Sequence, residues 1–272
     1  MSKKYYVMLE NTEIHSATAN SNIFTNGFPA LTNFIGFAEF IKYKINLIEN
    51  SLIEKVKISV VINKINFHKI HSKFQIYRKI DKVDNSNLNA STVEEYKANL
   101  NLNLILKLEL DEDNLINDSE IDTINFIKDF FDKNRYNFKI AGGKVFTFKE
   151  TITSDYSNIL KKLKNYKQSF ILEKSEYEFE NMSEDEIVNV LSGKTYGKHF
   201  LLQTGYNLLE DFQESNFSRN NEETATAYPT FDLLRVRKIA SYLFEQNYLD
   251  IFNFFEHKYL KDKKSLNCIF SK

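Results

Sequence analysis

The sequence predicts an α+β fold with a ferredoxin-like β-α-β-β-α-β core, an elaborated hairpin and a helical, thumb-like insertion. Two observations predict this fold. Apolar runs of strand type and helix type follow one another in that order, and one long run alternates leucine with other residues without a break. With 272 residues and 42% hydrophobic content, the chain can bury a substantial core.

The first two elements are a strand and a helix. Residues 5–9, YYVML, form a short apolar run typical of a buried strand. Pro29 then precedes a helical pattern, at a position where its missing N–H costs no hydrogen bond. The apolar residues of this pattern are Leu31, Phe34, Ile35, Ala38, Ile41, Ile45 and Ile48.

Three strand-like runs follow. Residues 55–65, KVKISVVINKI, and 72–80, SKFQIYRKI, are rich in β-branched residues. Residues 98–111, ANLNLNLILKLELD, place leucine at every second position from Leu100 to Leu110. Because side chains alternate between the two faces of a strand, we expect one face to be buried and the other to be polar.

The core ends with a second helix and another strand. Residues 119–133 carry acidic residues in the first turn and repeat Ile121, Ile124, Ile127 and Phe131 at helical spacing. Residues 138–148, FKIAGGKVFTF, are predicted to form a strand interrupted by a glycine pair. The order of elements over residues 1–150 therefore matches a unit that also underlies RNA-recognition (RRM) domains.

The rest of the chain differs in character. Residues 151–198 are charged and predicted to form a helical insertion, in which Ser183 and Glu186 have the spacing of a capping box. Residues 199–209 and 228–236 are strand-like and are expected to return to the core. The aromatic segment 242–260 is predicted to be a C-terminal helix. We therefore divide the chain into an RRM-like core at 1–150, the insertion at 151–198, and returning strands with a helix at 199–272.

Composition and motifs exclude several classes of function. The net charge of −1 creates no global field toward nucleic acid or anionic lipid. A single cysteine, Cys268, leaves no disulfide framework, and no run has the length of a signal peptide or membrane span. We therefore expect a soluble cytoplasmic protein with no membrane partner. The sequence has no Walker loop, zinc-type cysteine cluster, G-x-S-x-G or HExxH motif, so we expect no cofactor and no metal site.

Basic and aromatic residues interleave between residues 54 and 82. Lys73, Arg78 and Lys79 lie close in sequence to His71 and Tyr77 on a predicted sheet. Basic side chains bind phosphates and aromatic rings stack on bases, so this combination suits single-stranded RNA. The alternative is an ordinary solvated face, which explains most charge runs.

A histidine and a pair of glycines each allow two interpretations, one functional and one structural. His15 follows the first strand and is a candidate general base for a metal-independent ribonuclease, although a lone histidine is more often structural. Gly142 and Gly143 are either a simple bulge or the place where an RNA backbone approaches closely, with Lys144 beside it on a phosphate.

Residues 20–41, NSNIFTNGFPALTNFIGFAEFI, combine a Gly-Phe-Pro turn with the start of a helix. This segment resembles the signature of the second Csy subunit of type I-F CRISPR surveillance complexes, within the fifth Cas family of the RAMP superfamily. The resembling positions are Asn20, Gly27, Phe28, Pro29, Thr32, Phe34, Gly36 and Phe37. Four later blocks resemble the family in order: FQIYRKIDKVDNSNLNASTVEEYKANLNLNLIL, KIAGGKVF, HFLLQTGYNLLEDF and SRNNEETATAYPTFDLLRV. The chain departs from the family in being shorter between 151 and 199 and in placing Asn221 and Glu222 after Arg219 and Asn220.

The resemblance implies a non-catalytic RNA-binding subunit. Such a subunit caps the 5′ handle of the CRISPR RNA, docks the large subunit that inspects target DNA, and abuts the adjacent backbone subunit. Together with the basic strand, the resemblance implies RNA contacts from Asn20, Asn26, Phe28, His71, Lys73, Tyr77, Arg78, Lys79, Gly142, Gly143, Lys144, Tyr206, Arg219 and Asn220.

Alternatives stay open at several points. Phe28 either contacts RNA or a partner, or it caps the core; Asn20 and Asn26 either read base edges or bond their own loop. The chain is alternatively a metal-independent endoribonuclease that processes precursor CRISPR RNA, or a repeated backbone subunit that coats the spacer. In compact complexes without a large subunit, the resemblance also allows contact with the motif that flanks the DNA target.

Overall fold

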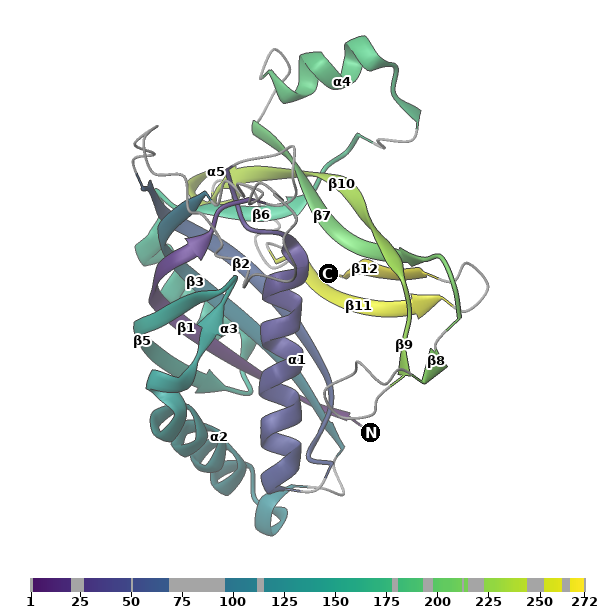
Figure 1. Cartoon of the computed structure of the whole chain (residues 1–272). Coiled ribbons are helices and arrows are strands. Elements are labelled where there is room, and N and C mark those ends of the chain that lie inside the picture. The colour runs from purple at the N-terminus through teal and green to yellow at the C-terminus, as the bar shows by residue number, and fades with distance from the viewer. Residues whose placement is uncertain are drawn as a thin grey trace, which may run out of the picture.

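The computed structural model describes residues 2–20, 27–49, 51–68, 96–111, 115–177, 181–192, 198–211, 213–214, 223–243, 252–260 and 265–271. This part of the chain is a mixed α/β structure built on one large, curled, antiparallel sheet (Figure 1). The predicted strand at 72–80 lies outside the described residues. So do the predicted site residues Asn26, His71, Lys73, Tyr77, Arg78, Lys79, Arg219 and Asn220.

The strands of the large sheet lie in the order β11-β12-β7-β10-β6-β2-β3-β1-β5-β4. Their bounds are β1 Ser2–Thr18, β2 Ile53–Phe67, β3 Lys97–Asp111, β4 Lys139–Ile140, β5 Gly143–Thr153, β6 Phe170–Lys174, β7 Lys198–Leu208, β10 Ala227–Lys238, β11 Phe254–Leu260 and β12 Ser265–Ser271. A separate small sheet pairs β8 Gln213–Glu214 with β9 Glu223–Thr224. The helices are α1 Leu31–Ile48, α2 Glu120–Asn134, α3 Tyr156–Leu163, α4 Glu184–Leu191 and α5 Ile239–Leu243, with 3₁₀ turns η2 Ile116–Asp118, η3 Arg135–Asn137 and η4 Lys164–Tyr166. None of the described helices is long and apolar enough to cross a membrane.

Helices α1 and α2 cover the face of the sheet that carries the leucines of β3. The prediction of α1 is confirmed, because its apolar stripe from Leu31 to Ile45 is buried in the main core. Only the last predicted position, Ile48, is exposed, at the end of the helix. In α2, Ser119 caps the first turn by accepting a hydrogen bond from the Asp122 N–H, and the predicted apolar residue Ile121 is exposed.

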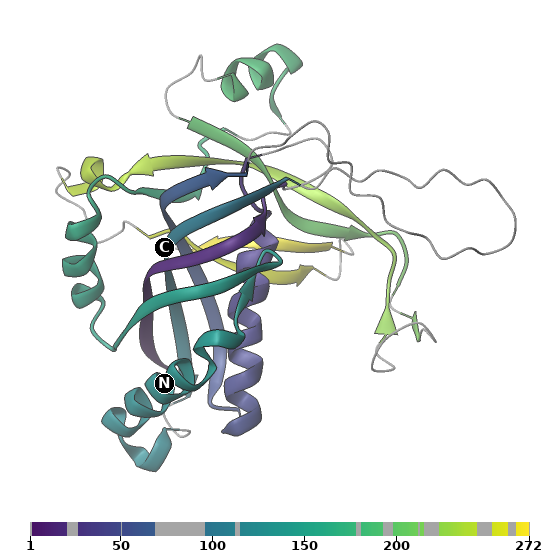
Figure 2. The same cartoon turned by 60° about the vertical axis from the view of Figure 1, so that its left-hand side comes forward.

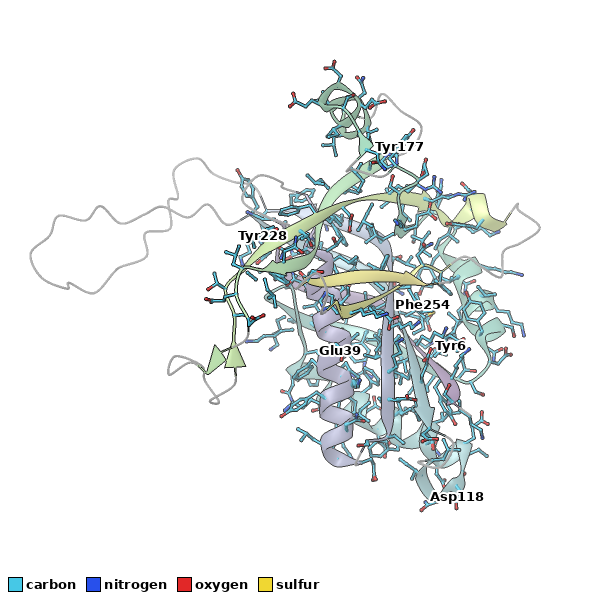
Figure 3. The ribbon with its side chains drawn as sticks, turned by 90° about the vertical axis from the view of Figure 1, so that its right-hand side faces the viewer. Tyr6, Glu39, Asp118, Tyr177, Tyr228 and Phe254 are labelled. Atoms are coloured by element: carbon cyan, nitrogen blue, oxygen red, sulfur yellow. The ribbon has the colours of Figure 1, made fainter. Side chains whose placement is uncertain are left out.

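The opposite face of the sheet is also covered, which corrects the expectation of a polar face along β3. Ile105 is fully buried in a second apolar cluster, together with Met8 of β1 and Val61 of β2. Helices α3 and α5 and the segment around Phe254 close over this cluster, and Figure 2 shows α1 and α3 on opposite sides of the strands. The Phe254 ring lies against Tyr6 of β1, with ring centroids 6.5 Å apart (Figure 3).

The sheet curls back on itself through β2. The edge of β2 that faces away from β3 pairs with β6 at Val61–Ile171 and with β11 at Ile58–Phe255. Strands β2, β6, β10, β7, β12 and β11 therefore close into a ring. The predicted returning strands at 199–209 and 228–236 correspond to β7 and β10.

The C-terminal segment is the clearest error of the sequence prediction. Residues 242–260 were expected to be helical, but α5 ends at Leu243 and residues 254–260 form β11. Phe254 packs in the second cluster and Phe255 in the main core, so successive rings enter opposite faces of the sheet. This alternation has the period of a strand. The insertion also contributes β6 to the sheet, and the capping box at Ser183 and Glu186 is confirmed.

A candidate nucleic-acid interface at one end of the sheet

A tight hairpin between β4 and β5 builds one side of the candidate site. Lys139 pairs with Lys144 and Ile140 with Gly143, which leaves Ala141 and Gly142 as the turn. Both turn residues have positive φ, 51° and 73°, as a type I′ hairpin turn requires. The Ala141 carbonyl accepts a hydrogen bond from the Thr18 N–H at 2.8 Å, which ties the turn to the end of β1.

Gly143 allows β1 to pass close to this hairpin. A Cβ atom at Gly143 would lie 2.7 Å from both the Ala17 nitrogen and the His15 carbonyl oxygen. Real Cβ atoms essentially never approach backbone atoms so closely. Of the two interpretations of Gly143, the structure therefore favours a close approach within the chain, because the backbone of β1 lies where its Cβ atom would be. Gly142 serves the turn itself.

Three basic or titratable side chains form a row across β1, β5 and β4. His15 pairs with Lys144, and Lys144 pairs with Lys139 on its other side. Directly opposed residues of an antiparallel sheet project from the same face, and all three side chains are exposed. Phe146 lies two residues further along β5 and is 56% exposed. Its ring stacks on the His15 ring, with centroids 4.8 Å apart and planes 12° apart. We call His15, Lys139, Lys144 and Phe146 the basic row.

Asparagines on β3 hold β1 in the shape that presents His15. Strand β1 has two residues with positive φ, Asn11 and Ser16, at its register shifts. The Asn11 N–H donates to Asn103 Oδ1 at 2.7 Å, and the Ser16 N–H donates to Asn99 Oδ1 at 3.0 Å. The polar positions of β3 thus satisfy backbone groups that the irregular strand leaves without ladder partners.

Asn99 links this part of β1 to β2. Its Oδ1 atom lies 3.0 Å from Nε2 of His68, which follows directly after β2. The backbone N–H of His68 donates to the Lys97 carbonyl at 2.9 Å. His68 is exposed. Because Phe67 pairs with Ala98, and Ala98 with Ala17, His68 lies at the same end of the sheet as the basic row. Sequence reasoning missed Phe146, Asn99 and His68 as members of this site. The outward position of Phe146 in a strand that buries its neighbour Val145 was the available signal.

The Gly-Phe-Pro turn is part of the architecture. Phe28 is only 2% exposed, and its ring stacks on Phe34 of α1 with centroids 5.4 Å apart. Of the two interpretations of Phe28, the structure therefore supports the core contact, because a covered ring leaves no face for a base. Asn20 is half-buried and accepts a hydrogen bond from the Tyr96 N–H at 3.1 Å, which is a local backbone contact.

Tyr206 does not join the basic row. It lies on β7, where it pairs with Pro229 of β10 and Leu266 of β12. Strands β10, β6, β2, β3 and β1 lie between β7 and β5 in the sheet. The structure therefore brings Lys144 and His15 together and leaves Tyr206 elsewhere. Within the described ranges, no three His, Cys, Asp or Glu side chains lie close enough to hold a metal ion.

The sequence matches the family of CRISPR-associated proteins Cas_Csy2 over residues 7–174. The chain belongs to this family. It is thus a Csy2-type CRISPR-associated protein of the type I-F system and a member of a CRISPR effector complex. The match runs from β1 to β6 and includes the whole basic row. Comparison with curated proteins gives no match.

Proposed function

We propose that this Csy2-family chain binds the 5′ handle of the CRISPR RNA without cleaving it and docks the large subunit of its effector complex. The observation that carries the proposal is the basic row. Lys139 and Lys144 face each other across two strands, an arrangement that repels unless an anion lies between or above them. A phosphate supplies that charge, and the exposed ring of Phe146 next to it offers a stacking surface for a base.

We further infer that the strands β5, β1, β3 and β2, with α1 and α2 on one face, correspond to a ferredoxin-like, RRM-like unit. RRM domains stack bases on aromatic rings of the open sheet face. Here α3 and Phe254 cover the middle of that face. The end of the sheet at Phe146 remains exposed, so RNA is expected to bind there and not across the centre.

The test uses the full chain and single-stranded RNA with the sequence of the repeat-derived 5′ handle. Replacing Lys139 and Lys144 with alanine removes two phosphate contacts. The slope of log affinity against log salt concentration should then fall by about 1.4, at roughly 0.7 per contact on a single strand. The matched control replaces Lys128 and Lys133 of α2, which are also exposed. If both double variants bind like the parent chain at every salt concentration, the basic row is not the RNA site.

One observation favours a nuclease as a second candidate function. His15 and His68 lie at the same end of the sheet, and Asn99 contacts both the Ser16 N–H and the His68 ring. Two histidines supply the acid and the base of a metal-independent ribonuclease. Incubation of the chain with repeat RNA and a chelator separates the candidates. Our proposal requires the RNA to stay intact, whereas cleavage that disappears in His15→Ala and His68→Ala variants would establish the nuclease.

A repeated backbone subunit is the remaining alternative, and stoichiometry distinguishes it. A handle cap is expected once per complex, whereas a subunit that coats the spacer occurs several times. Native mass spectrometry of the assembled complex gives this number directly.

A further inference from the structure

Helix α1 carries an exposed apolar stripe on the side that faces away from the core. Phe40, Tyr43 and Leu47 are 40%, 58% and 61% exposed. With Gly36 they follow one another at intervals of four, three and four residues, so they lie in one line along the helix. We call these four residues the outer stripe. It spans about 17 Å at 1.5 Å per residue, and Figure 1 shows α1 at the front of the molecule.

Gly36 is an unusual residue for the interior of an 18-residue helix. Glycine weakens a helix there relative to alanine, and it is retained where something must come close. Among the described residues, no heavy atom lies within 4 Å of the position that a Cβ atom would take at Gly36. The glycine therefore serves no close contact within the part of the chain that the structure describes. Its open position allows the backbone of a partner to approach α1.

Lys44 gives the stripe a charge. Its Nζ atom lies 5.7 Å from the ring centroid of Phe40 and 5.8 Å from that of Tyr43. Within the part of the chain that the structure describes, Lys44 forms no ion pair. The neighbouring Lys42 is engaged differently, because it donates to the Glu54 carbonyl at 2.7 Å. A carboxylate of a partner would thus find an available ammonium group at the centre of an apolar line.

We propose that the outer stripe docks an α-helix of the large subunit of the effector complex. The partner helix would pack apolar side chains at matching spacing on Phe40, Tyr43 and Leu47, approach closely at Gly36, and bring an acidic side chain to Lys44. This inference rests on the proposed docking of the large subunit and adds the surface of this chain that contacts it. The stripe lies on the other side of the sheet from α3 and apart from the basic row, so protein docking and RNA binding are separable.

The experiment co-expresses the full chain with the other protein subunits of its own complex and the CRISPR RNA. Tyr43→Glu and Leu47→Glu should each reduce retention of the large subunit at least tenfold. The matched control is Ile121→Glu on α2, which makes the same kind of change at a site that is 71% exposed. Affinity of the isolated chain for handle RNA is measured in parallel. It should stay within twofold, so failure of RNA binding and failure of docking are distinguishable.

Gly36→Ala gives the sharpest result, because stability and assembly should move in opposite directions. Removing a helix-interior glycine should raise the Tm of the isolated chain by about 2 °C. The added methyl group should still weaken assembly. Normal assembly of Gly36→Ala, Tyr43→Glu and Leu47→Glu would overturn the proposal. It would also be overturned if the isolated chain dimerises, or binds vesicles of zwitterionic and anionic phospholipid, in a way that Leu47→Glu abolishes.

Discussion

The imidazole of His15 lies flat on the ring of Phe146, with the two ring planes 12° apart. The two residues come from different strands, and the pairing of His15 with Lys144 places a lysine beside the stack. A base can extend this stack while its phosphate reaches the lysine. The exposed aromatic pair and the adjacent cations thus combine the two contacts that single-stranded RNA needs.

Phe146→Ala should weaken handle RNA binding without unfolding the chain. Stacking of a base on an aromatic ring contributes about 1–3 kcal/mol by alanine substitution, and 1.4 kcal/mol is roughly a tenfold change in affinity. The ring is exposed, so its removal leaves no cavity in the core. Binding titrations and thermal unfolding are measured on the same variant. Phe146→Tyr keeps the stacking surface and should bind like the parent chain.

Phe28→Ala should instead destabilise the fold. Truncating a buried phenylalanine costs about 3–5 kcal/mol, and Phe28 loses its stack with Phe34. Urea unfolding measures the free energy of unfolding, with Phe40→Ala as the exposed control, expected to change it little. If Phe28→Ala keeps full stability yet binds RNA tenfold more weakly, the Gly-Phe-Pro turn is a recognition element after all.

Gly143→Ala tests the close approach of β5 to β1. Its new methyl group would meet the Ala17 and His15 backbones at 2.7 Å, so the strands must separate locally. We expect a loss of about 2–3 kcal/mol of folding free energy, at the upper end of ordinary substitutions. RNA affinity should fall only in proportion to the unfolded fraction. A variant of normal stability that fails to bind RNA would return Gly143 to the RNA site.

Stability should decrease below neutral pH because of His199. This side chain is buried on β7, its ring nitrogens have no hydrogen-bond partner among the described residues, and burial lowers its pKa from the usual 6.5. As the pH falls below about 6.5, His199 binds a proton in the unfolded chain but stays neutral in the native state. The free energy of unfolding therefore decreases. The stabilisation that the neutral His199 side chain contributes is fully present above about pH 6.5. It is lost as the pH falls toward the lowered pKa of His199.

His199→Phe should therefore reduce the difference between urea midpoints measured at about pH 7 and pH 5. Some dependence will remain, because burial lowers the pKa of His257 in the same direction. An identical pH dependence in the variant and the parent chain would mean that His199 does not couple protonation to folding.

The sequence predicted the elements whose pattern is local. The stripe of α1 has helical period, and the leucines of β3 have strand period, so both could be placed from neighbouring residues alone. The residues that cover Ile105 could not be placed in this way, because they belong to α3, to α5 and to the segment at Phe254, far along the chain. The aromatic segment that forms β11 was misassigned because a run of bulky residues fits either period until its partners are known.

The candidate site shows the same limit. Lys144 was predicted as an RNA contact from its place beside the glycine pair, whereas His15 was considered only as a candidate general base. Their pairing across β1 and β5 depends on strand register, which involves the irregular positions Asn11 and Ser16. Asn99 and Asn103 support those positions through hydrogen bonds between residues far apart in sequence, which no local pattern could predict. These two asparagines of β3 therefore have a structural role.

The most direct test of the central claim is a crosslink from the site to the RNA. A photoreactive benzoylphenylalanine replaces Phe146 in the full complex assembled on its CRISPR RNA, and the crosslinked nucleotide is mapped by primer extension. Our account predicts a crosslink confined to the 5′ handle and its loss when Lys139 and Lys144 are both alanine. Crosslinks spread along the spacer, or only to protein, would contradict it.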